Sequence, residues 1–346
     1  MYLYTIFIII MEKIKVGVIG VGHLGLHHAR IYSQLLEAEL VGVYDIDQEK
    51  SQKVASDLGV KSFENLESLL TAVKAVSCVV PTSAHHQVTY EVLDRKIDCL
   101  LEKPIAQTVS QAQELIGLAD KYKLIFQVGH IERFNPSVLT LKDLGVDLDP
   151  KFIETHRLAA FTERGTDVAV ILDLMIHDID LILSWVKSEI EEIQAVGISV
   201  VSEADDIANA RITFKNGGVA NITASRISPR PMRKLRIFQK DLYLSLDLLD
   251  KSMEVYKLVP TAMGNNPLLS EKNIVGKIPV EKIGKTVIYE RPKIENQDML
   301  TLELKSFLDC VKNRTKPLVS GVEAKKALEV ALEIERKSQE HRKKLL

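Results

Sequence analysis

The chain of 346 residues is long enough for about two domains of ordinary size. Apolar residues make up 46% and charged residues 27%, as in ordinary globular proteins, and a formal charge of -2 excludes a general attraction to nucleic acid or anionic lipid. The widely spaced Cys78, Cys99 and Cys310 favour a reducing compartment over a disulfide framework, and we expect them to be buried, unreactive thiols.

The first ten residues, MYLYTIFIII, are apolar but too few to cross a bilayer as a helix, which needs about 20 residues. No Lys or Arg precedes them, as a secretory signal would require. Met11 then opens a stretch that is typical of a protein start. We therefore expect residues 1–13 to be a leader that is disordered or not translated, in a cytoplasmic protein that does not bind membranes.

The next segment, residues 14–130, alternates short β-branched runs with amphipathic stretches. The predicted strands are 15–19, 40–44, 76–80, 98–101 and 124–128, and the predicted helices are 24–37, 48–58, 84–95 and 108–121. Apolar strands separated by helices are typical of a parallel sheet covered on both faces. We therefore predict a doubly wound α/β domain of the Rossmann type.

A glycine-rich turn lies between the first predicted strand and the first predicted helix. Its expected dinucleotide-binding residues are Gly20, Gly22, His23, Leu24 and Gly25. Gly20 permits a tight turn, Gly22 lets backbone amides approach a pyrophosphate, and Gly25 lets the helix pack closely on the sheet. The helix N-terminus adds partial positive charge. The turn therefore predicts a dinucleotide site.

Asp45 ends the second predicted strand, twenty residues after Gly25. Its carboxylate can accept hydrogen bonds from both hydroxyls of the adenosine ribose, and its charge would repel a 2′-phosphate. No basic residue stands at position 46 or 47 to receive that phosphate. The sequence therefore favours NAD over NADP.

Two more segments follow strands at the carboxyl edge of the predicted sheet, where ligands of such folds bind. Pro81 and Thr82 follow the strand 76–80, and His85 comes shortly after them, next to His86. We expect Pro81, Thr82 and His85 at the cofactor, although the histidines could equally be exposed residues of a helix start.

The second of these segments is Glu102-Lys103-Pro104, which follows the strand 98–101. This position places Glu102 and Lys103 where a bound nicotinamide would lie. Lys103 is therefore a candidate for both cofactor contact and catalysis.

After residue 130 the pattern changes to strand-like alternation with fewer helices. We expect a short helix ending near 144, strands at 151–160, 191–201 and 206–228, a strand pair within 233–258, and helices at 298–312 and 322–342. Asn216-Gly217-Gly218 is a strong hairpin signal. The sequence therefore predicts an α+β domain over residues 131–346, on an open and mostly antiparallel sheet, with packing of the terminal helix on the first domain as an option.

Apolar residues dominate the segment DVAVILDLMIHDIDLILSWV, which predicts a buried helix. Its polar residues at spacings of 4, 3 and 4 share one stripe and are Asp173, His177, Asp180 and Ser184. Burying such a stripe is costly unless it meets partners or a polar cavity. We interpret the stripe as the floor of an active site, and Asp178, which lies off it, as structural.

His177 permits three interpretations. It could be a hydrogen-bonded core histidine or a zinc ligand with Asp173, but no third ligand stands at a suitable spacing, so we expect no metal. It could also be a general base oriented by a carboxylate one turn away, which the predicted dinucleotide domain favours.

Together, the glycine turn, Glu102-Lys103-Pro104 and Asp173-x-x-x-His177-x-x-Asp180 resemble the glucose-fructose oxidoreductase / inositol dehydrogenase / MocA family, over essentially residues 14–340. The resemblance implies that Lys103, Asp173 and His177 form the catalytic set and that the protein is a homodimer or homotetramer. The phrases VGHIERFNP and HRLAAFTERGTDVAVILDLMIHDID are most similar to the subgroup that oxidises the 3-hydroxyl of UDP-N-acetylglucosamine.

The expected reaction oxidises a secondary hydroxyl of a sugar or nucleotide sugar to a ketone. His177 takes the hydroxyl proton, Asp173 orients the imidazole, and Lys103 hydrogen-bonds the oxygen as charge builds on it. Lys103 is the alternative base, if its surroundings favour the neutral amine. Asp180 either binds a sugar hydroxyl or braces the helix.

A locally basic segment, RISPRPMRKLR, begins at Arg226. A solvated strand face is the simpler interpretation, and the functional one is that Arg226 or Arg230, with Arg164, binds the diphosphate of a nucleotide sugar. The segment has no interleaved aromatic residues, so we do not expect nucleic-acid binding.

Three other functions remain open at this point. The enzyme could oxidise a free sugar or inositol, the chain could be a non-catalytic regulator that senses sugar and NAD, or it could reduce a carbonyl compound with NADPH. Asp45 disfavours the last of these, and Lys103 with His177 disfavours the regulator.

Overall fold

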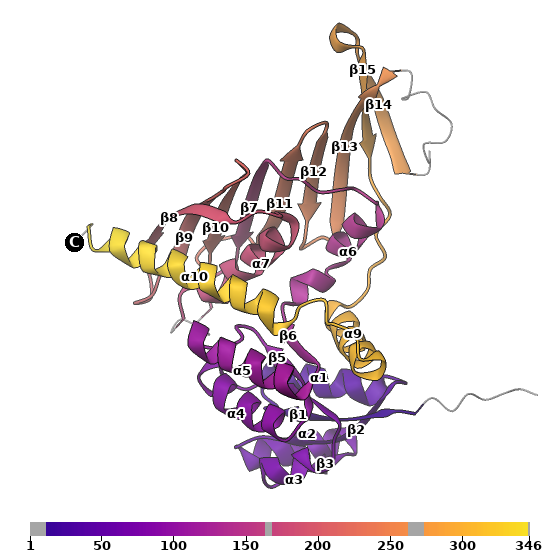
Figure 1. The fold of residues 1–346 in the computed structure, drawn as a ribbon, viewed down its shortest axis with the longest axis vertical. Coiled ribbons are helices and arrows are strands. Elements are labelled where there is room, and N and C mark those ends of the chain that lie inside the picture. Colours follow the sequence, from indigo (N-terminus) through magenta and orange to yellow (C-terminus); the bar gives the residue numbers. More distant parts are fainter. Residues whose placement is uncertain (1–11, 163–167, 262–272, 345–346) are drawn as a thin grey trace, which may run out of the picture. The chain divides into compact units, whose positions relative to one another are not determined.

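A computed structural model describes residues 12–162, 168–261 and 273–344 (Figure 1). Nearly all of the predicted leader therefore lies outside the described residues. The chain forms two compact units, one with the residues up to Gly129 and Leu300–Val322, the other with His130–Met299 and the residues from Glu323 onward. The segment Leu300–Val322, which we expected in the second domain, thus belongs to the first unit.

The first unit is built on a six-stranded parallel sheet in the order β3-β2-β1-β4-β5-β6. Its strands are β1 (Ile14–Ile19), β2 (Ala38–Tyr44), β3 (Lys61–Ser62), β4 (Ala75–Cys78), β5 (Asp98–Glu102) and β6 (Phe126–Gly129). Its helices are α1 (His23–Gln34), α2 (Gln48–Leu58), α3 (Leu66–Leu70), α4 (Thr82–Asp94), α5 (Val109–Tyr122) and most of α9 (Met299–Asn313). This strand order confirms the predicted doubly wound fold.

The place of α9 follows from its apolar face. Leu304 and Phe307 are fully buried and belong to the same core as Val16 and Val18 of β1. The helix therefore covers part of the parallel sheet although about 170 residues separate it from β6 along the chain.

The second unit is built on a nine-stranded sheet in the order β14-β15-β13-β12-β11-β7-β10-β9-β8. Its strands are β7 (Phe152–Leu158), β8 (Ile190–Ile198), β9 (Ile207–Phe214), β10 (Val219–Ser225), β11 (Met232–Gln239), β12 (Leu242–Asp247), β13 (Ser252–Pro260), β14 (Ile274–Val280) and β15 (Lys285–Glu290). Among the described strands of this second sheet, only the pairing of β7 with β10 is parallel, which confirms a mostly antiparallel sheet. The segment 233–258 holds parts of three strands rather than the expected pair.

Helices cover one face of this sheet (Figure 1). They are α6 (Pro136–Asp143), the π-helical turn η2 (Ile171–Met175), α7 (Ile176–Trp185) and α10 (Gly321–Arg342), preceded by the 3₁₀ turn η1 (Ile131–Phe134). Strand β7 shows the resulting alternation, since Ile153 and Thr155 are buried while Phe152 and Glu154 on the opposite face are partly exposed. No helix within the described ranges is long and apolar enough to span a membrane.

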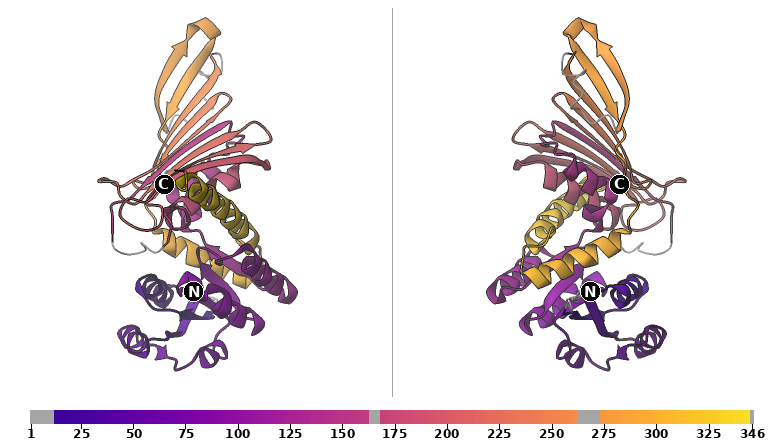
Figure 2. Two further views of the ribbon diagram at one scale, coloured as in Figure 1. Left: turned by 90° about the vertical axis from the view of Figure 1, so that its left-hand side faces the viewer. Right: turned by 90° about the vertical axis from the view of Figure 1, so that its right-hand side faces the viewer.

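The helices leave the other face of this sheet uncovered (Figure 2). A row of aromatic rings crosses that face. The rings belong to directly paired residues of five strands, with neighbouring centroids 4.6–5.8 Å apart: Phe152, Phe238, Tyr243, Tyr256 and Tyr289. All are partly exposed. Cross-strand aromatic pairs stabilise the sheet, but they leave apolar surface on this face.

The three cysteines are free and buried, as expected. Burial raises the pKa of the Cys78 thiol to about 12 and that of Cys99 well above its usual value. Both thiols therefore stay protonated and unreactive at neutral pH.

Candidate functional site

The glycine-rich turn after β1 has the backbone geometry that its sequence predicts. Gly20 has a φ of +81°, and a Cβ there would lie 2.6 Å from the carbonyl oxygen of Val79. A Cβ on Gly25 would lie only 1.9 Å from the carbonyl oxygen of Gly20. Both positions therefore require glycine, because any side chain would collide with backbone.

Gly22 differs from its two neighbours because a Cβ there would meet no atom within 4 Å. It is the N-cap of α1, which has neither a side-chain cap nor an acidic residue in its first turn. His23 and Leu24 are exposed on that turn. The open backbone and the uncapped helix start fit the phosphates of a dinucleotide.

This geometry makes Gly22 a sharp test of dinucleotide binding. We expect Gly22→Ala to fold with native stability but to bind NADH about tenfold or more weakly, because its methyl group would occupy the space that the phosphates approach. Fluorescence titration and thermal unfolding measure the two quantities. Gly117→Ala in α5 is the matched control, since its Cβ also meets nothing within 4 Å. Native NADH affinity in Gly22→Ala would contradict this placement of the phosphates.

Asp45 follows β2 and lies next to the glycine turn. Its carboxylate accepts hydrogen bonds from the backbone N–H groups of Val21 (2.7 Å) and Asp47 (2.9 Å). Each carboxylate oxygen keeps a second lone pair for a ribose hydroxyl. The position of Asp45 thus fits the role that its spacing predicts.

His85 departs from the expectation that it contacts the cofactor. Its side chain is buried, with Nδ1 2.7 Å from the carbonyl oxygen of Pro104 and Nε2 2.9 Å from that of Val80. Burial lowers the pKa of His85, although both carbonyl contacts oppose this. We therefore correct its role to bracing the segments that follow β4 and β5. Pro81 and Thr82, which lie at the start of α4, remain at the carboxyl edge of the sheet. His86 instead pairs with Glu114 at 2.8 Å.

Glu102 and Lys103 stand at the carboxyl end of β5, and the peptide bond from Lys103 to Pro104 is cis. The Glu102 carboxylate accepts the backbone N–H of Lys103 and lies 3.2 Å from Nε2 of the buried His28. These contacts fix the backbone from which the Lys103 side chain extends. His28 was not predicted from the sequence, because a histidine on an amphipathic helix carries no signal of its distant partner.

In the second unit, the predicted helix is interrupted by a π-helical turn. Asp173 lies in η2 and His177 in the first turn of α7, and both side chains are partly buried. The imidazole of His130 faces that of His177 edge-on, with ring centroids 6.4 Å apart and planes at 80°. Single π turns are frequent at functional sites, and this one lies within the predicted catalytic motif.

Two ion-pair groups, one of them partly and the other fully buried, anchor α7. Arg133 donates to both carboxylate oxygens of Asp180, at 2.5 and 3.1 Å. Arg157 donates to Asp178 at 2.7 Å and to Glu132 at 2.8 Å, and all three side chains are buried. The expectation that Asp178 is structural therefore agrees with its contacts, and of the two roles expected for Asp180 the geometry favours bracing.

The expected diphosphate contact of Arg226 also needs correction. Its guanidinium is buried and donates to Asp206 (2.9 Å), to the carbonyl oxygen of Val168 (2.7 Å) and to Ser202 (3.2 Å). These bonds direct its donors into the protein. Arg230 is exposed, and Arg164 lies outside the described residues.

The candidate catalytic residues are thus divided between the two units. Lys103 belongs to the first unit with the glycine turn and Asp45, while Asp173, His177 and Asp180 belong to the second. Among the residues that the structure describes, no group of three or more His, Cys, Asp and Glu side chains is arranged to hold a metal ion.

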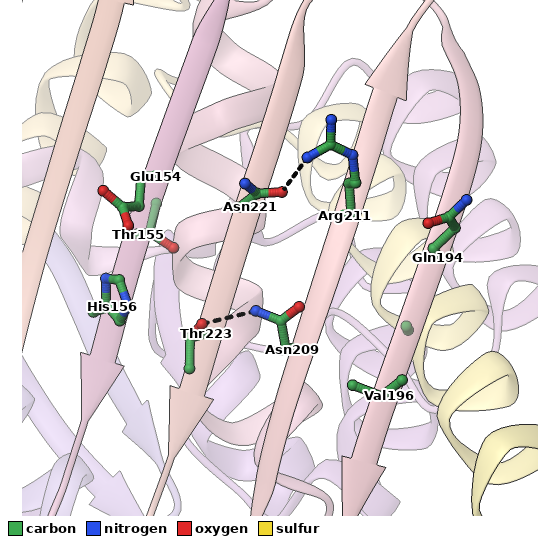
Figure 3. Close-up of a pocket in the computed structure, with 10 residues that line it drawn as sticks. Glu154, Thr155, His156, Gln194, Val196, Asn209, Arg211, Asn221 and Thr223 are labelled. Atoms are coloured by element: carbon green, nitrogen blue, oxygen red, sulfur yellow. Dashed lines mark hydrogen bonds between the residues drawn. The ribbon is translucent and has the colours of Figure 1, made fainter.

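A separate hollow of about 470 Å³ lies on the open face of the second sheet (Figure 3). It is lined by polar side chains of β7 to β10, which bond to one another: Asn209 to Thr223 at 2.9 Å and Arg211 to Asn221 at 3.1 Å. Glu154 and His156 flank it on β7. It contains none of the predicted catalytic residues.

Comparison with known proteins supports the same interpretation of both units. Residues 14–130 match a family described as "Oxidoreductase family, NAD-binding Rossmann fold", and residues 149–242 match the "GFO/IDH/MocA C-terminal domain". The chain is 34% identical over 324 residues to UDP-N-acetylglucosamine 3-dehydrogenase of Acidithiobacillus ferrooxidans, covering 94% of this chain and 97% of the other. It is 27% identical over 229 residues to inositol 2-dehydrogenase of Rubrobacter xylanophilus, covering 63% and 66%.

A solved structure also matches this chain over nearly its full length. The crystal form P21 of the Acidithiobacillus ferrooxidans enzyme superposes with a TM-score of 0.84 at 33% identity, covering 96% of this chain and 99% of that one. Both units thus have counterparts in a single solved chain.

Proposed function

Because the chain belongs to the Gfo/Idh/MocA family of oxidoreductases, we propose that it oxidises a secondary hydroxyl of a nucleotide sugar to a ketone, with the 3-hydroxyl of UDP-N-acetylglucosamine as the leading candidate. The observation that supports this substrate most strongly is the near full-length similarity to one named UDP-N-acetylglucosamine 3-dehydrogenase. A free sugar or inositol is the second candidate, supported by the shorter match to an inositol dehydrogenase.

The cofactor proposed is NAD, which supplies the hydride acceptor when bound. The backbone of Gly20, Gly22 and Gly25 and the start of α1 at His23 and Leu24 would hold its phosphates. Asp45 would accept hydrogen bonds from the adenosine ribose hydroxyls, and its charge disfavours the 2′-phosphate of NADP. Pro81, Thr82 and Glu102 line the same edge of the sheet, at the ends of β4 and β5.

The proposed chemistry uses three side chains of this chain. His177 takes the proton of the substrate hydroxyl, Asp173 orients the imidazole and stabilises its charged form, and Lys103 donates a hydrogen bond to the oxygen. His130, which faces His177 edge-on, limits the positions open to that ring. Asp180 holds α7 through Arg133, so we assign it a positioning role.

A substrate panel tests the proposal directly. UDP-sugars, free sugars and inositols are each supplied with NAD or with NADP, and NADH or NADPH formation is followed by absorbance. We expect UDP-N-acetylglucosamine with NAD to give the highest kcat/KM, with NAD preferred by about tenfold or more because Asp45 would meet a 2′-phosphate as a like charge. Turnover of inositol alone would select the second candidate. No turnover of any of these compounds would indicate a regulator, and a preference for NADP would contradict the role of Asp45.

We also propose a cytoplasmic homodimer or homotetramer that associates through the open face of the second sheet. Three free thiols support the reducing compartment. The row of partly exposed aromatic rings supports the interface, because such patches on soluble proteins often mark association surfaces. Light scattering of the purified protein measures the mass, and a monomer at micromolar concentration would contradict the proposal.

A further inference from the structure

The first unit contains a set of buried polar side chains, most of which the proposed reaction does not use. We call them the inner polar cluster, and its members are His28, Tyr32, Ser77, Glu102, Gln127 and Glu303. They come from α1, β4, β5, β6 and α9. All except Glu102 are fully buried, and the Glu102 side chain is 14% exposed.

Glu303 is the unusual member of this cluster. Among the described residues, neither of its carboxylate oxygens has a hydrogen-bond partner, and the amide of Gln127 donates instead to its backbone carbonyl at 3.4 Å. Two other polar atoms here, Nδ1 of His28 and Oε1 of Gln127, also lack partners in the described part of the chain. An ionised carboxylate at this position would be a buried charge without a donor, which is among the costliest arrangements in a protein.

Glu102 has the opposite surroundings. Its carboxylate lies at hydrogen-bonding distance from His28 and accepts the backbone N–H of Lys103, both at 3.2 Å. Burial alone would raise the pKa of Glu102, but His28 and the charge of Lys103 outweigh it and lower the pKa. Burial, and then the negative charge of Glu102, raise the pKa of Glu303 well above its usual value. Tyr32, whose pKa is also raised by burial, remains a neutral phenol.

We propose that Glu102 and Glu303 act as a buried carboxyl pair that carries one negative charge at neutral pH, with the proton on Glu303. Glu303 is then a positioning residue, because its neutral form leaves Glu102 free to hold the backbone of Lys103 and to place a single anion beside its ammonium group. Two anions at this position would repel each other and weaken that arrangement. The positioning role rests on the proposed function of Lys103, whereas the proton on Glu303 does not.

Infrared spectroscopy tests the proton without any substrate. The native protein at neutral pH should show the carbonyl stretch of a protonated carboxylic acid, and Glu303→Gln should lack it. Glu39→Gln, at an exposed position of β2, is the matched control and should keep the band. An identical acid band in Glu303→Gln and native protein, or no acid band in the native protein, would overturn the proposal.

The pH dependence of stability provides a second test. The folded pKa of Glu303 lies above the value of about 4.3 expected in the unfolded chain, so its contribution to stability is complete below that value and is lost as pH rises. From about pH 5 upward, until Glu303 ionises in the folded protein, the unfolding constant of the native protein should therefore rise with pH relative to that of Glu303→Gln, by up to about tenfold per pH unit. A ratio that stays constant as pH rises would contradict a neutral Glu303.

The link to Lys103 is tested by steady-state kinetics of the two variants. Glu102→Gln removes the acceptor that holds the backbone of Lys103 and the anion beside its side chain, so kcat should fall about tenfold or more while KM changes less. Glu303→Gln replaces a neutral acid with a neutral amide and should cause a much smaller loss of kcat. A similar loss of kcat in both variants would contradict a neutral Glu303 and overturn the proposal. Absence of turnover in the native protein would refute the proposed function, while the infrared result would still decide the state of Glu303.

Discussion

Replacing Lys103 with methionine is expected to lower kcat by about 10²–10⁴-fold while NADH binding stays within about threefold of native. The change keeps the length of the side chain but removes the charge that would stabilise the substrate oxygen as its proton leaves. The dinucleotide site should survive, because its glycine turn and Asp45 lie at the ends of β1 and β2, not of β5. Steady-state kinetics and NADH fluorescence measure the two quantities.

Lys53→Met is the matched control for this experiment, because Lys53 is exposed on α2 of the same unit. It should retain native turnover. Native turnover in Lys103→Met would remove Lys103 from the catalytic set, and loss of NADH binding together with turnover would point to a collapsed cofactor site instead.

Replacing His177 with alanine is expected to lower kcat by a similar factor of about 10²–10⁴, because the substrate hydroxyl would lose its proton acceptor. The acidic limb of the kcat/KM profile should disappear with it, since that limb reports the protonation of the base. Asp173→Asn should keep this limb but lower kcat, because the imidazole would lose its charged partner. A pH profile of each variant with saturating NAD provides the measurement.

Ser184→Ala is the matched control for the His177 and Asp173 variants. It tests whether any substitution on the polar stripe of this helix lowers kcat. Ser184 lies on α7 with His177, but its hydroxyl donates only to the carbonyl oxygen of Leu181 within the helix. We expect native turnover in this variant. If His177→Ala retained both its turnover and its acidic limb, Lys103 would become the candidate base.

The long elements of both units were predictable because each repeats a simple pattern of apolar residues. Strand β1 is apolar and buried, and β9 alternates buried with less buried residues, as their sequences indicate. The elements β3 and α3 have two and five residues, too few for a period to be recognised. The strands β14 and β15 were not predicted. In β14 the apolar Val275 and Ile278 are exposed, so its apolar residues do not mark a buried face.

The glycine turn was predictable in atomic detail because its chemistry is local. Gly20 and Gly25 are required by clashes with nearby backbone, and such constraints are visible in a short motif. Asp45 follows at a spacing that the strand and helix lengths fix. The backbone geometry of the turn could therefore be predicted without knowledge of the rest of the chain, while the dinucleotide contacts of these residues stay a prediction.

The partners of buried charges could not be predicted, because they are distant in sequence. Arg226, just after β10, bonds to Asp206, just before β9. His85 contacts the carbonyl oxygens of Val80 and Pro104, which lie in two separate loops. Glu303 lies about 200 residues from Glu102, and its sequence position on an amphipathic helix suggests nothing unusual. Each of these side chains takes its role from the fold and not from its neighbours in the chain.

A crystal structure with NADH and the preferred substrate tests the central claim most directly. The claim is that Lys103 of the first unit and the His177–Asp173 couple of the second act on one hydroxyl group. We predict that Nζ of Lys103 and a ring nitrogen of His177 both lie within about 2.6–3.2 Å of the same substrate oxygen, with the carbinol carbon about 3–3.5 Å from C4 of the nicotinamide. A bound sugar whose hydroxyls contact neither residue, or contact only one of them, would contradict the account.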